Sequence, residues 1–170
     1  AIEIGNALSI QYGHKIINLM PTNLYGPNDN FHPTNSHVIP GLISKFYNGK
    51  INNLETVQIW GDGSPLREFL YVDDLSNAIS FTIENDINES LMNVGSSEEI
   101  SILGLAEMIK DVVGFNGVIA FDKTKPNGND RKLLDSSLIN SFGWSPKITL
   151  NEGLEKTYSW YVKNYDNLRV

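Results

Sequence analysis

The sequence predicts an α/β fold, and two patterns in it indicate this class. Short apolar runs that end near glycine, proline or asparagine alternate with longer segments in which apolar residues recur at helical spacing. The chain has 170 residues, of which 41% are hydrophobic and 19% are charged, so it can bury one substantial core or two interleaved half-domains. We therefore expect strands and helices to alternate along a globular chain.

Helices are predicted where apolar positions share one face. In chain order they are expected at about residues 1–12, 37–50, 73–83, 101–113, 138–142 and 149–162. Three of them carry start signals: Asp73 or Asp74 is the expected N-cap of the third, Ser101 caps the fourth, and Thr149 with Glu152 forms a capping box for the last.

Strands are predicted from the short apolar runs between these helices. They are expected at residues 15–20, 57–60, 67–72, 91–95 and 118–121. Gly114 and Gly117 are spaced like the glycines of a dinucleotide-binding turn, but they follow a helix and precede a strand, which is the reverse of the order that binds a pyrophosphate. Gly114 is therefore expected to end a helix.

Charge and cysteine content exclude several classes of function. The formal net charge is −7 at pH 7, whereas proteins that bind nucleic acid or an acidic membrane need a basic face. The chain has no cysteine, hence no disulfide or thiolate metal site, and we predict no metal ligands. No apolar run has membrane-spanning length and no signal peptide is visible, which favours a cytoplasmic protein. A small anionic ligand held by a few local cations is compatible with this composition.

The segment 21–40, with the sequence PTNLYGPNDNFHPTNSHVIP, is the most distinctive part of the chain. It holds two of the three histidines and four of the seven prolines, yet it is almost uncharged. An apolar strand leads into it and a helix follows it, and ligands of open α/β sheets bind at such strand-to-helix crossings. We expect a functional loop here, with a merely irregular connection as the alternative.

Several motifs resemble the extended short-chain dehydrogenase/reductases that act on nucleotide sugars, within the NAD-dependent epimerase/dehydratase family. Tyr25-Gly26-Pro27 and the run 60–74, WGDGSPLREFLYVDD, are similar to signatures of that family. The segment 21–40, the run RKLLD at 131–135 and Gly143-Trp144 resemble its GDP-L-fucose synthase branch. The resemblance covers essentially the whole chain.

The resemblance implies an NADP(H)-dependent epimerase-reductase with a GDP-sugar substrate. Enzymes of that branch epimerise C3 and C5 of GDP-4-keto-6-deoxy-D-mannose and then reduce the C4 ketone. By this resemblance, residues 1–35 and 67–95 would complete a Rossmann domain, and residues 36–66 and 96–170 would form a smaller sugar-nucleotide domain. The family's homodimer would be formed through helices that include residues 1–12.

Two parts of such an enzyme are not found in this sequence. There is no glycine-rich strand-to-helix turn and no Tyr-x-x-x-Lys motif, and by motif alignment the latter would end just before Ala1. The cysteine that the family uses as its epimerisation base would also lie upstream. Because the first helix begins without a capping residue, we expect a C-terminal portion of a longer enzyme, inactive by itself.

His37 is the expected acid in epimerisation. Protons alpha to a ketone leave one face and return to the other, so a proton donor is needed opposite the base. At a helix N-terminus the dipole disfavours imidazolium, which helps His37 to release its proton. The alternative is a histidine that only caps the helix through a hydrogen bond.

The resemblance also assigns binding residues. Pro21, Thr22, Asn23 and Leu24, with His37, would line the nicotinamide end of the cofactor, although a plain strand terminus is an equal alternative for Thr22. The substrate contacts it implies are Lys45, Trp60, Arg67, Asn127 and Lys132.

The chemistry of these side chains allows more than one role for some of them. Arg67 can grip a pyrophosphate in bidentate fashion, or pair with Glu68 or Asp73 on the surface. Trp60 can pack on the nucleotide or be an ordinary buried aromatic. Lys45 stands where the family often has arginine, and Asn127 where relatives have aspartate.

Two rival functions stay open at this stage. One is another nucleotide-sugar epimerase, dehydratase or reductase of the same fold. The other is a sugar-nucleotide-binding module without catalysis.

Overall fold

The computed structural model describes residues 2–32 and 35–168 and confirms the α/β class. The helices are α1 (Ile2–Tyr12), α2 (Val38–Ile51), α3 (Val72–Glu84), α4 (Ile102–Val113), α5 (Ser137–Ser141), α6 (Leu150–Lys163) and the 3₁₀ helix η1 (Tyr165–Asn167). The strands are β1 (Asn18–Pro21), β2 (Asn23–Tyr25), β3 (Thr56–Trp60), β4 (Leu66–Tyr71), β5 (Leu91–Val94), β6 (Glu99–Ser101), β7 (Val118–Asp122) and β8 (Arg131–Lys132).

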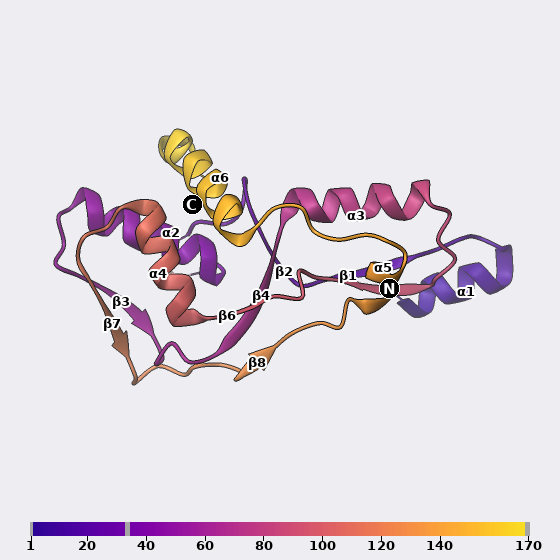
Figure 1. Cartoon of the computed structure of the whole chain (residues 1–170), viewed down its shortest axis with the longest axis horizontal. Coiled ribbons are helices and arrows are strands. Elements are labelled where there is room, and N and C mark those ends of the chain that lie inside the picture. Colours follow the sequence, from indigo (N-terminus) through magenta and orange to yellow (C-terminus); the bar gives the residue numbers. More distant parts are fainter. Residues whose placement is uncertain (1, 33–34, 169–170) are drawn as a thin grey trace.

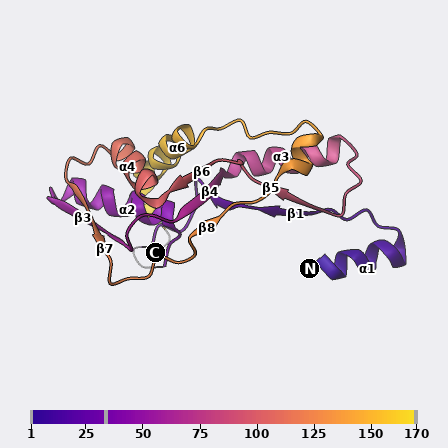
Figure 2. The same ribbon diagram turned by 60° about the horizontal axis from the view of Figure 1, so that its bottom comes forward.

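The molecule is elongated, with β4 running between two groups of elements (Figure 1). Helices α2, α4 and α6 gather with β3 and β7 at one end, and α1, α3 and α5 lie with β1 and β5 at the other. The turned view keeps this division and shows α1 apart from the helices α2, α4 and α6 (Figure 2). No helix in the described ranges is long and apolar enough to cross a membrane.

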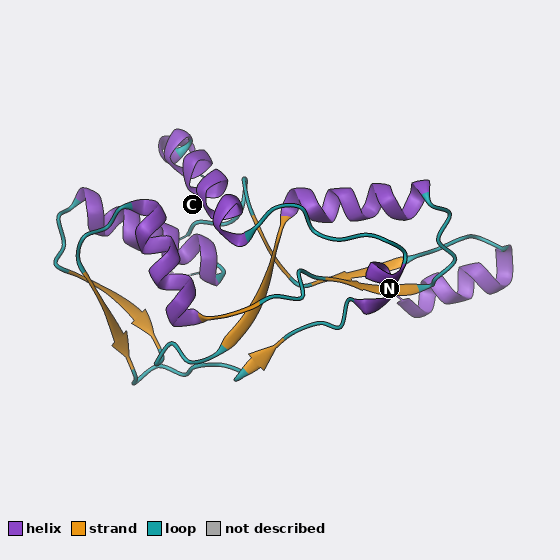
Figure 3. Cartoon of the chain, viewed as in Figure 1, coloured by secondary structure: helices purple, strands orange, loops and turns teal. Residues whose placement is uncertain are grey.

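Strand pairing joins segments that are distant in sequence. β1 pairs with β5, β2 with β4 and β3 with β7, all in parallel, whereas β6 runs antiparallel to β4 (Figure 3). The two-residue β8 adds to the same strand, so that Arg67 on β4 and Lys132 on β8 are register partners. β4 is thus the strand on which the elements around the site converge.

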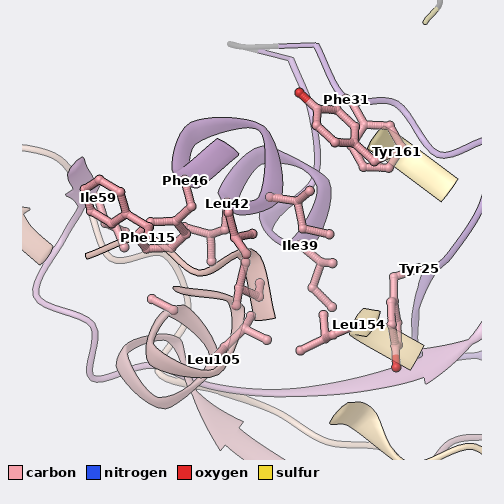
Figure 4. Close-up of a cluster of buried hydrophobic side chains, with 14 of the residues drawn as sticks. Tyr25, Phe31, Ile39, Leu42, Phe46, Ile59, Leu105, Phe115, Leu154 and Tyr161 are labelled. Atoms are coloured by element: carbon pink, nitrogen blue, oxygen red, sulfur yellow. The ribbon is translucent and has the colours of Figure 1, made fainter. Parts of the chain in front are cut away.

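The buried apolar side chains form two clusters. The larger one packs α2, α4 and α6 together, with Phe46 against Phe115 and Phe31 against Tyr161 (Figure 4). The smaller one lies beside β1, β5 and α3 and includes Ile139 and Trp144 from the chain's last third. Segment 21–40 is therefore anchored in the larger cluster through Phe31, which is 4% exposed.

The local signals for several helices are confirmed. The side chain of Ser101 accepts a hydrogen bond from the Gly104 N–H, and α4 ends at Gly114 with a left-handed φ of 72°. The capping box of Thr149 and Glu152 is present at the start of α6. These motifs need only three or four neighbouring residues, so the sequence specifies them directly.

Other expectations are wrong in detail. α3 has Tyr71 as its N-cap, not Asp73 or Asp74, and it begins at Val72, which was expected in the preceding strand. The Asp74 carboxylate is buried and accepts hydrogen bonds from the N–H groups of Lys147 and Ile148, at 2.9 and 3.0 Å. These bonds satisfy two backbone donors, and a buried donor without a partner would cost free energy.

The strands also depart from expectation in several places. β1 starts at Asn18 instead of residue 15. The short strands β2, β6 and β8 were not predicted. Of these, β2 lies within segment 21–40, which was expected to form a loop. Each of these three strands has at most three residues, too few to show a period in the sequence.

Candidate functional site

Two neighbouring cavities lie where segment 21–40 meets β4 and α2. We call the first the strand cavity; it has a volume of about 440 Å³ and is lined by Thr22, Asn23, Leu24, Asp29, His37, Val38, Ile39, Pro40, Arg67 and Phe69. We call the second the tryptophan cavity; it has a volume of about 320 Å³ and is lined by Ser36, His37, Val38, Gly41, Leu42, Lys45, Ile59, Trp60, Arg67, Ile102, Pro126 and Asn127. His37, Val38 and Arg67 line both, so the two cavities meet at these residues.

His37 stands at the N-terminus of α2 as its N-cap residue. Its backbone is extended, with φ −69° and ψ 170°, and its side chain makes no capping hydrogen bond. The imidazole is exposed, and it borders both cavities. The alternative in which this side chain caps the helix is therefore wrong, and the imidazole is available to a ligand.

Arg67 lies on β4 between the two cavities. Its Nη1 donates to the carbonyl of Leu66 over 2.7 Å, and among the described residues it has no ion pair with a carboxylate. The alternative of a pair with Glu68 or Asp73 is wrong. The remaining N–H groups of the half-buried guanidinium can meet an anion in either cavity.

Trp60 and Lys45 line the tryptophan cavity, and Lys125 lies over the same indole from outside the lining. The indole is 58% exposed, so the alternative of an ordinary buried aromatic is wrong. The Nζ atoms of Lys45 and Lys125 each lie 5.7 Å from the centroid of a Trp60 ring. Lys45 Nζ also donates to the Gln58 carbonyl at 3.3 Å, and partial burial lowers the pKa of this lysine.

Asn127 serves the turn at the base of the tryptophan cavity. Its Oδ1 accepts a hydrogen bond from the backbone N–H of Asp62 at 2.8 Å. Hydrogen bonds from Ser64 and then from Asn127 lower the pKa of the exposed Asp62 carboxyl to about 2. An aspartate at position 127 would place a second negative charge beside this carboxylate, so an amide suits the turn.

The polar groups of the strand cavity are partly used within the fold. Thr22 Oγ1 and Asn23 Nδ2 both donate to the carbonyl of Glu68, at 3.3 and 2.7 Å. Leu24, Val38 and Phe69 supply an apolar wall beside them. A flat heteroaromatic ring of the nicotinamide type fits such a wall, with Thr22 and Asn23 fixing the strand that carries it.

Two expected site residues do not line either cavity. Pro21 lies in β1 opposite Val94 and is exposed. Lys132 is exposed on β8, next to Arg67 by strand register. Its neighbour Arg131 is bound to Glu99 through Nε and Nη2, at 2.8 and 2.7 Å, which lowers the pKa of Glu99.

A buried carboxylate holds the segment that carries Lys132. Glu68 is fully buried, and it accepts hydrogen bonds from Ser97 N at 2.7 Å and from Leu134 N at 3.1 Å. Two successive residues of β4 therefore serve different purposes. Arg67 borders the cavities, and Glu68 holds the 131–135 run through its bond to Leu134.

Two residues at the cavities were not singled out from the sequence. Lys125 sits over Trp60, and Asp29 lines the strand cavity. Lys125 lies in a polar run of lysine, proline and glycine with no periodic signal, and Asp29 reads as a turn residue. The only indication in the sequence that Asp29 lies at a site is that it belongs to segment 21–40.

Fold and cavities together define an α/β protein with two adjoining cavities between a parallel strand pair and a helix N-terminus. The NAD dependent epimerase/dehydratase family matches residues 1–95, and this chain belongs to that family.

Similar proteins include several fucose synthases. GDP-L-fucose synthase 1 of Arabidopsis thaliana is 52% identical over 166 residues, which cover 98% of this chain and 51% of that protein. GDP-L-fucose synthase of Escherichia coli (strain K12) is 42% identical over 177 residues, covering 99% of this chain and 55% of the relative. This chain thus spans about half the length of the curated relatives it matches.

A solved structure shows the same likeness. The structure of a GDP-L-fucose synthetase from Naegleria fowleri bound to NADP superposes with a TM-score of 0.89 at 29% identity. The match covers 99% of this chain and 55% of that one.

Proposed function

We propose that this chain is the C-terminal portion of an NADP(H)-dependent epimerase-reductase that converts GDP-4-keto-6-deoxy-D-mannose to GDP-L-fucose. The observation that carries the proposal is that His37 and Arg67 border both cavities. A sugar held at that junction has a proton donor and a phosphate ligand within one site, with room for a nicotinamide ring on one side and a nucleotide on the other.

The tryptophan cavity is the proposed nucleotide side. Arg67 would bind the pyrophosphate with paired N–H groups, and Lys45 would add a point charge. Trp60 offers an exposed ring on which guanine can stack. Asn127 would act through the turn at Asp62 and Lys132 from the edge of β8, as weaker contacts.

The strand cavity is the proposed cofactor and sugar side. Thr22, Asn23 and Leu24 of the PTNL segment would hold the nicotinamide end, with the apolar wall of Leu24, Val38 and Phe69 excluding water from the ring. NADP(H), when bound, supplies the hydride for the C4 ketone. His37 would return a proton to C3 or C5 after deprotonation on the opposite face, while the base and the Tyr-x-x-x-Lys pair would come from the part of the enzyme upstream of Ala1.

The larger arrangement is also part of the proposal. Residues 1–35 and 67–95 would belong to a Rossmann domain, and residues 36–66 and 96–170 to a sugar-nucleotide domain. The homodimer would use helices that include α1, on which Ile4 and Ile10 are 66% and 87% exposed. Such apolar side chains on one helix are typical of a covered surface.

The test compares the complete enzyme with the 170-residue chain. We expect the complete enzyme to oxidise NADPH when given GDP-4-keto-6-deoxy-D-mannose and to release GDP-L-fucose, and the chain alone to oxidise none above a blank. Turnover of only a different nucleotide sugar would support the rival enzyme of the same fold. Binding of GDP-sugars without any turnover by the complete protein would support a non-catalytic binding module.

A further inference from the structure

The parallel strands β3 and β7 end beside the tryptophan cavity. Their last residues, Trp60 and Asp122, are register partners, and Trp60 lines the cavity. The segments that follow the two strands are bonded to each other, since the N–H of Asp62 donates to Asn127 Oδ1 at 2.8 Å. Ligands of α/β sheets bind beyond the carboxyl ends of parallel strands. The segment 122–128 therefore lies where a ligand of this cavity would meet it, in a place fixed by the strand pair.

Lys125 is carried by a hydrogen-bonded turn in that segment. Its N–H donates to the carbonyl of Asp122 at 3.1 Å. The Asp122 side chain accepts from the N–H and the hydroxyl of Thr124, at 3.0 and 2.5 Å, and these bonds, with a smaller contribution from the Lys125 charge, lower the pKa of the Asp122 carboxyl. The next two residues, Pro126 and Asn127, line the tryptophan cavity. The backbone of Lys125 is therefore held beside the cavity from both sides.

The ammonium of Lys125 has donors that the fold does not use. Its Nζ lies 5.7 Å from the centroid of a Trp60 ring, and among the described residues it has no hydrogen-bond or ion-pair partner. By contrast, the Nζ of Lys45, at the same distance from the indole, donates to the Gln58 carbonyl. An ammonium carries three donors, so Lys125 can serve a ligand that is bound against Trp60.

The segment 122–128 connects the proposed stacking surface with the proposed phosphate ligand. Lys125 contacts Trp60, the surface proposed for the base. Three residues later, Gly128 lies beside Arg67, since a Cβ built on Gly128 would be 3.5 Å from Arg67 Nη2. A nucleotide that spans from Arg67 to Trp60 would thus follow this segment, with its base at the end where Lys125 lies.

We propose that Lys125 recognises the base: its ammonium donates hydrogen bonds to O6 and N7 of a guanine stacked on Trp60. Guanine presents these two acceptors on one edge, whereas adenine presents an amino donor at position 6 of the same edge. The flexible four-carbon stem of lysine lets the ammonium move from the indole to the edge of the base. Lys125 thereby favours guanine over adenine nucleotides. This inference rests on the proposed function for the place of the nucleotide.

The test is Lys125→Met in the complete enzyme, because methionine keeps most of the side chain's length and removes its charge and donors. Calorimetry measures the affinity for GDP, for ADP and for inosine diphosphate, which has the same O6 and N7 acceptors as GDP. We expect the affinities for GDP and inosine diphosphate to fall about tenfold, and that for ADP by less than about twofold. The matched control is Lys123→Met, an exposed lysine that lines neither cavity, which should change none of the three.

The outcomes separate the inference from the proposed function. If the complete enzyme prefers GDP over ADP through Lys125 but does not turn over GDP-4-keto-6-deoxy-D-mannose, the proposed function fails and the role of Lys125 stands. If turnover occurs but Lys125→Met loses GDP and ADP affinity equally, Lys125 acts on the phosphates through its charge and the inference is overturned. Unchanged affinities, or a wild-type enzyme without preference for GDP, overturn it as well. Should Lys125→Met not fold, Lys125→Ala is measured in the same way, and an unchanged ratio of GDP to ADP affinity there also overturns the inference.

Discussion

The guanidinium of Arg67 donates from Nη1 to the carbonyl of Leu66, the residue before it on β4, over 2.7 Å. This bond holds the side chain close to its own strand, at the junction of the strand and tryptophan cavities, and no described carboxylate pairs with it. A preorganised, unpaired arginine is well suited to an anionic ligand, because little conformational entropy is lost when the ligand binds.

Replacing Arg67 should therefore weaken substrate binding selectively. In the complete enzyme, Arg67→Ala should cost about 1.5–3 kcal/mol of GDP-sugar binding, the usual worth of a hydrogen bond to a charged group. NADPH affinity should barely change, since the cofactor's phosphates would be held elsewhere. Calorimetry with both ligands measures this.

Arg131→Ala is the matched control for that experiment. Arg131 is exposed, bound to Glu99 and outside both cavities, so its loss should leave GDP-sugar affinity nearly unchanged. Equal losses of GDP-sugar and NADPH affinity in Arg67→Ala would mean that Arg67 holds the fold instead of the ligand.

Trp60 should report nucleotide binding through its fluorescence. A base stacked on an aromatic side chain contributes about 1–3 kcal/mol, so Trp60→Ala should weaken GDP binding by that amount. GDP should change the tryptophan emission of the wild-type enzyme, and the change should disappear in Trp60→Phe, which keeps an aromatic surface. The other two tryptophans of the chain, Trp144 and Trp160, line neither cavity, so an emission change on GDP binding should come from Trp60. An emission change that persists in Trp60→Phe would place the base elsewhere.

His37→Gln should separate the two chemical steps of the complete enzyme. The amide of glutamine is not acidic enough to protonate a sugar carbanion. Because the His37 side chain makes no capping hydrogen bond, folding should be unaffected by its replacement. Epimerisation should fall by about 10²–10⁴-fold, the range for general acid–base catalysis. Reduction of an already epimerised ketone should remain intact, because its proton donor would be the upstream tyrosine.

Solvent deuterium gives the direct readout for this variant. Proton removal can still exchange a position, but inverted product should not accumulate. Production of GDP-L-fucose at the wild-type rate by folded His37→Gln would remove His37 from the mechanism.

Glu68→Gln tests the buried carboxylate behind the site. One of its two oxygens would become an NH₂ group facing a backbone N–H of Ser97 or Leu134, and losing such a charge-assisted bond should cost about 1.5–3 kcal/mol of stability. The melting temperature of the complete enzyme should fall, and GDP-sugar affinity should weaken with it if the 131–135 run loosens. Glu107→Gln, with an exposed side chain, should show neither effect. A melting temperature equal to that of the wild type would show that Glu68 is not needed for the fold.

The sequence by itself determined the features that depend on near neighbours. The Ser101 cap and Gly114 end of α4, and the capping box of Thr149 and Glu152, follow from hydrogen bonds spanning three or four residues, so their signals are local. The polar composition of segment 21–40 likewise marked the region where both cavities lie. The family motifs named five residues that line the tryptophan cavity: His37, Lys45, Trp60, Arg67 and Asn127.

Only the tertiary structure decided what distant segments do together. Strands β2, β6 and β8 exist because β4 supplies their hydrogen-bonding partners, and two or three residues carry no period that a sequence can show. Asp74 does not cap α3, because its carboxylate accepts hydrogen bonds from the N–H groups of Lys147 and Ile148, which lie over seventy residues away in the sequence. Asp29 lines the strand cavity together with Arg67 and Phe69 of β4, and this neighbourhood is set by the tertiary fold, because no local pattern encodes it.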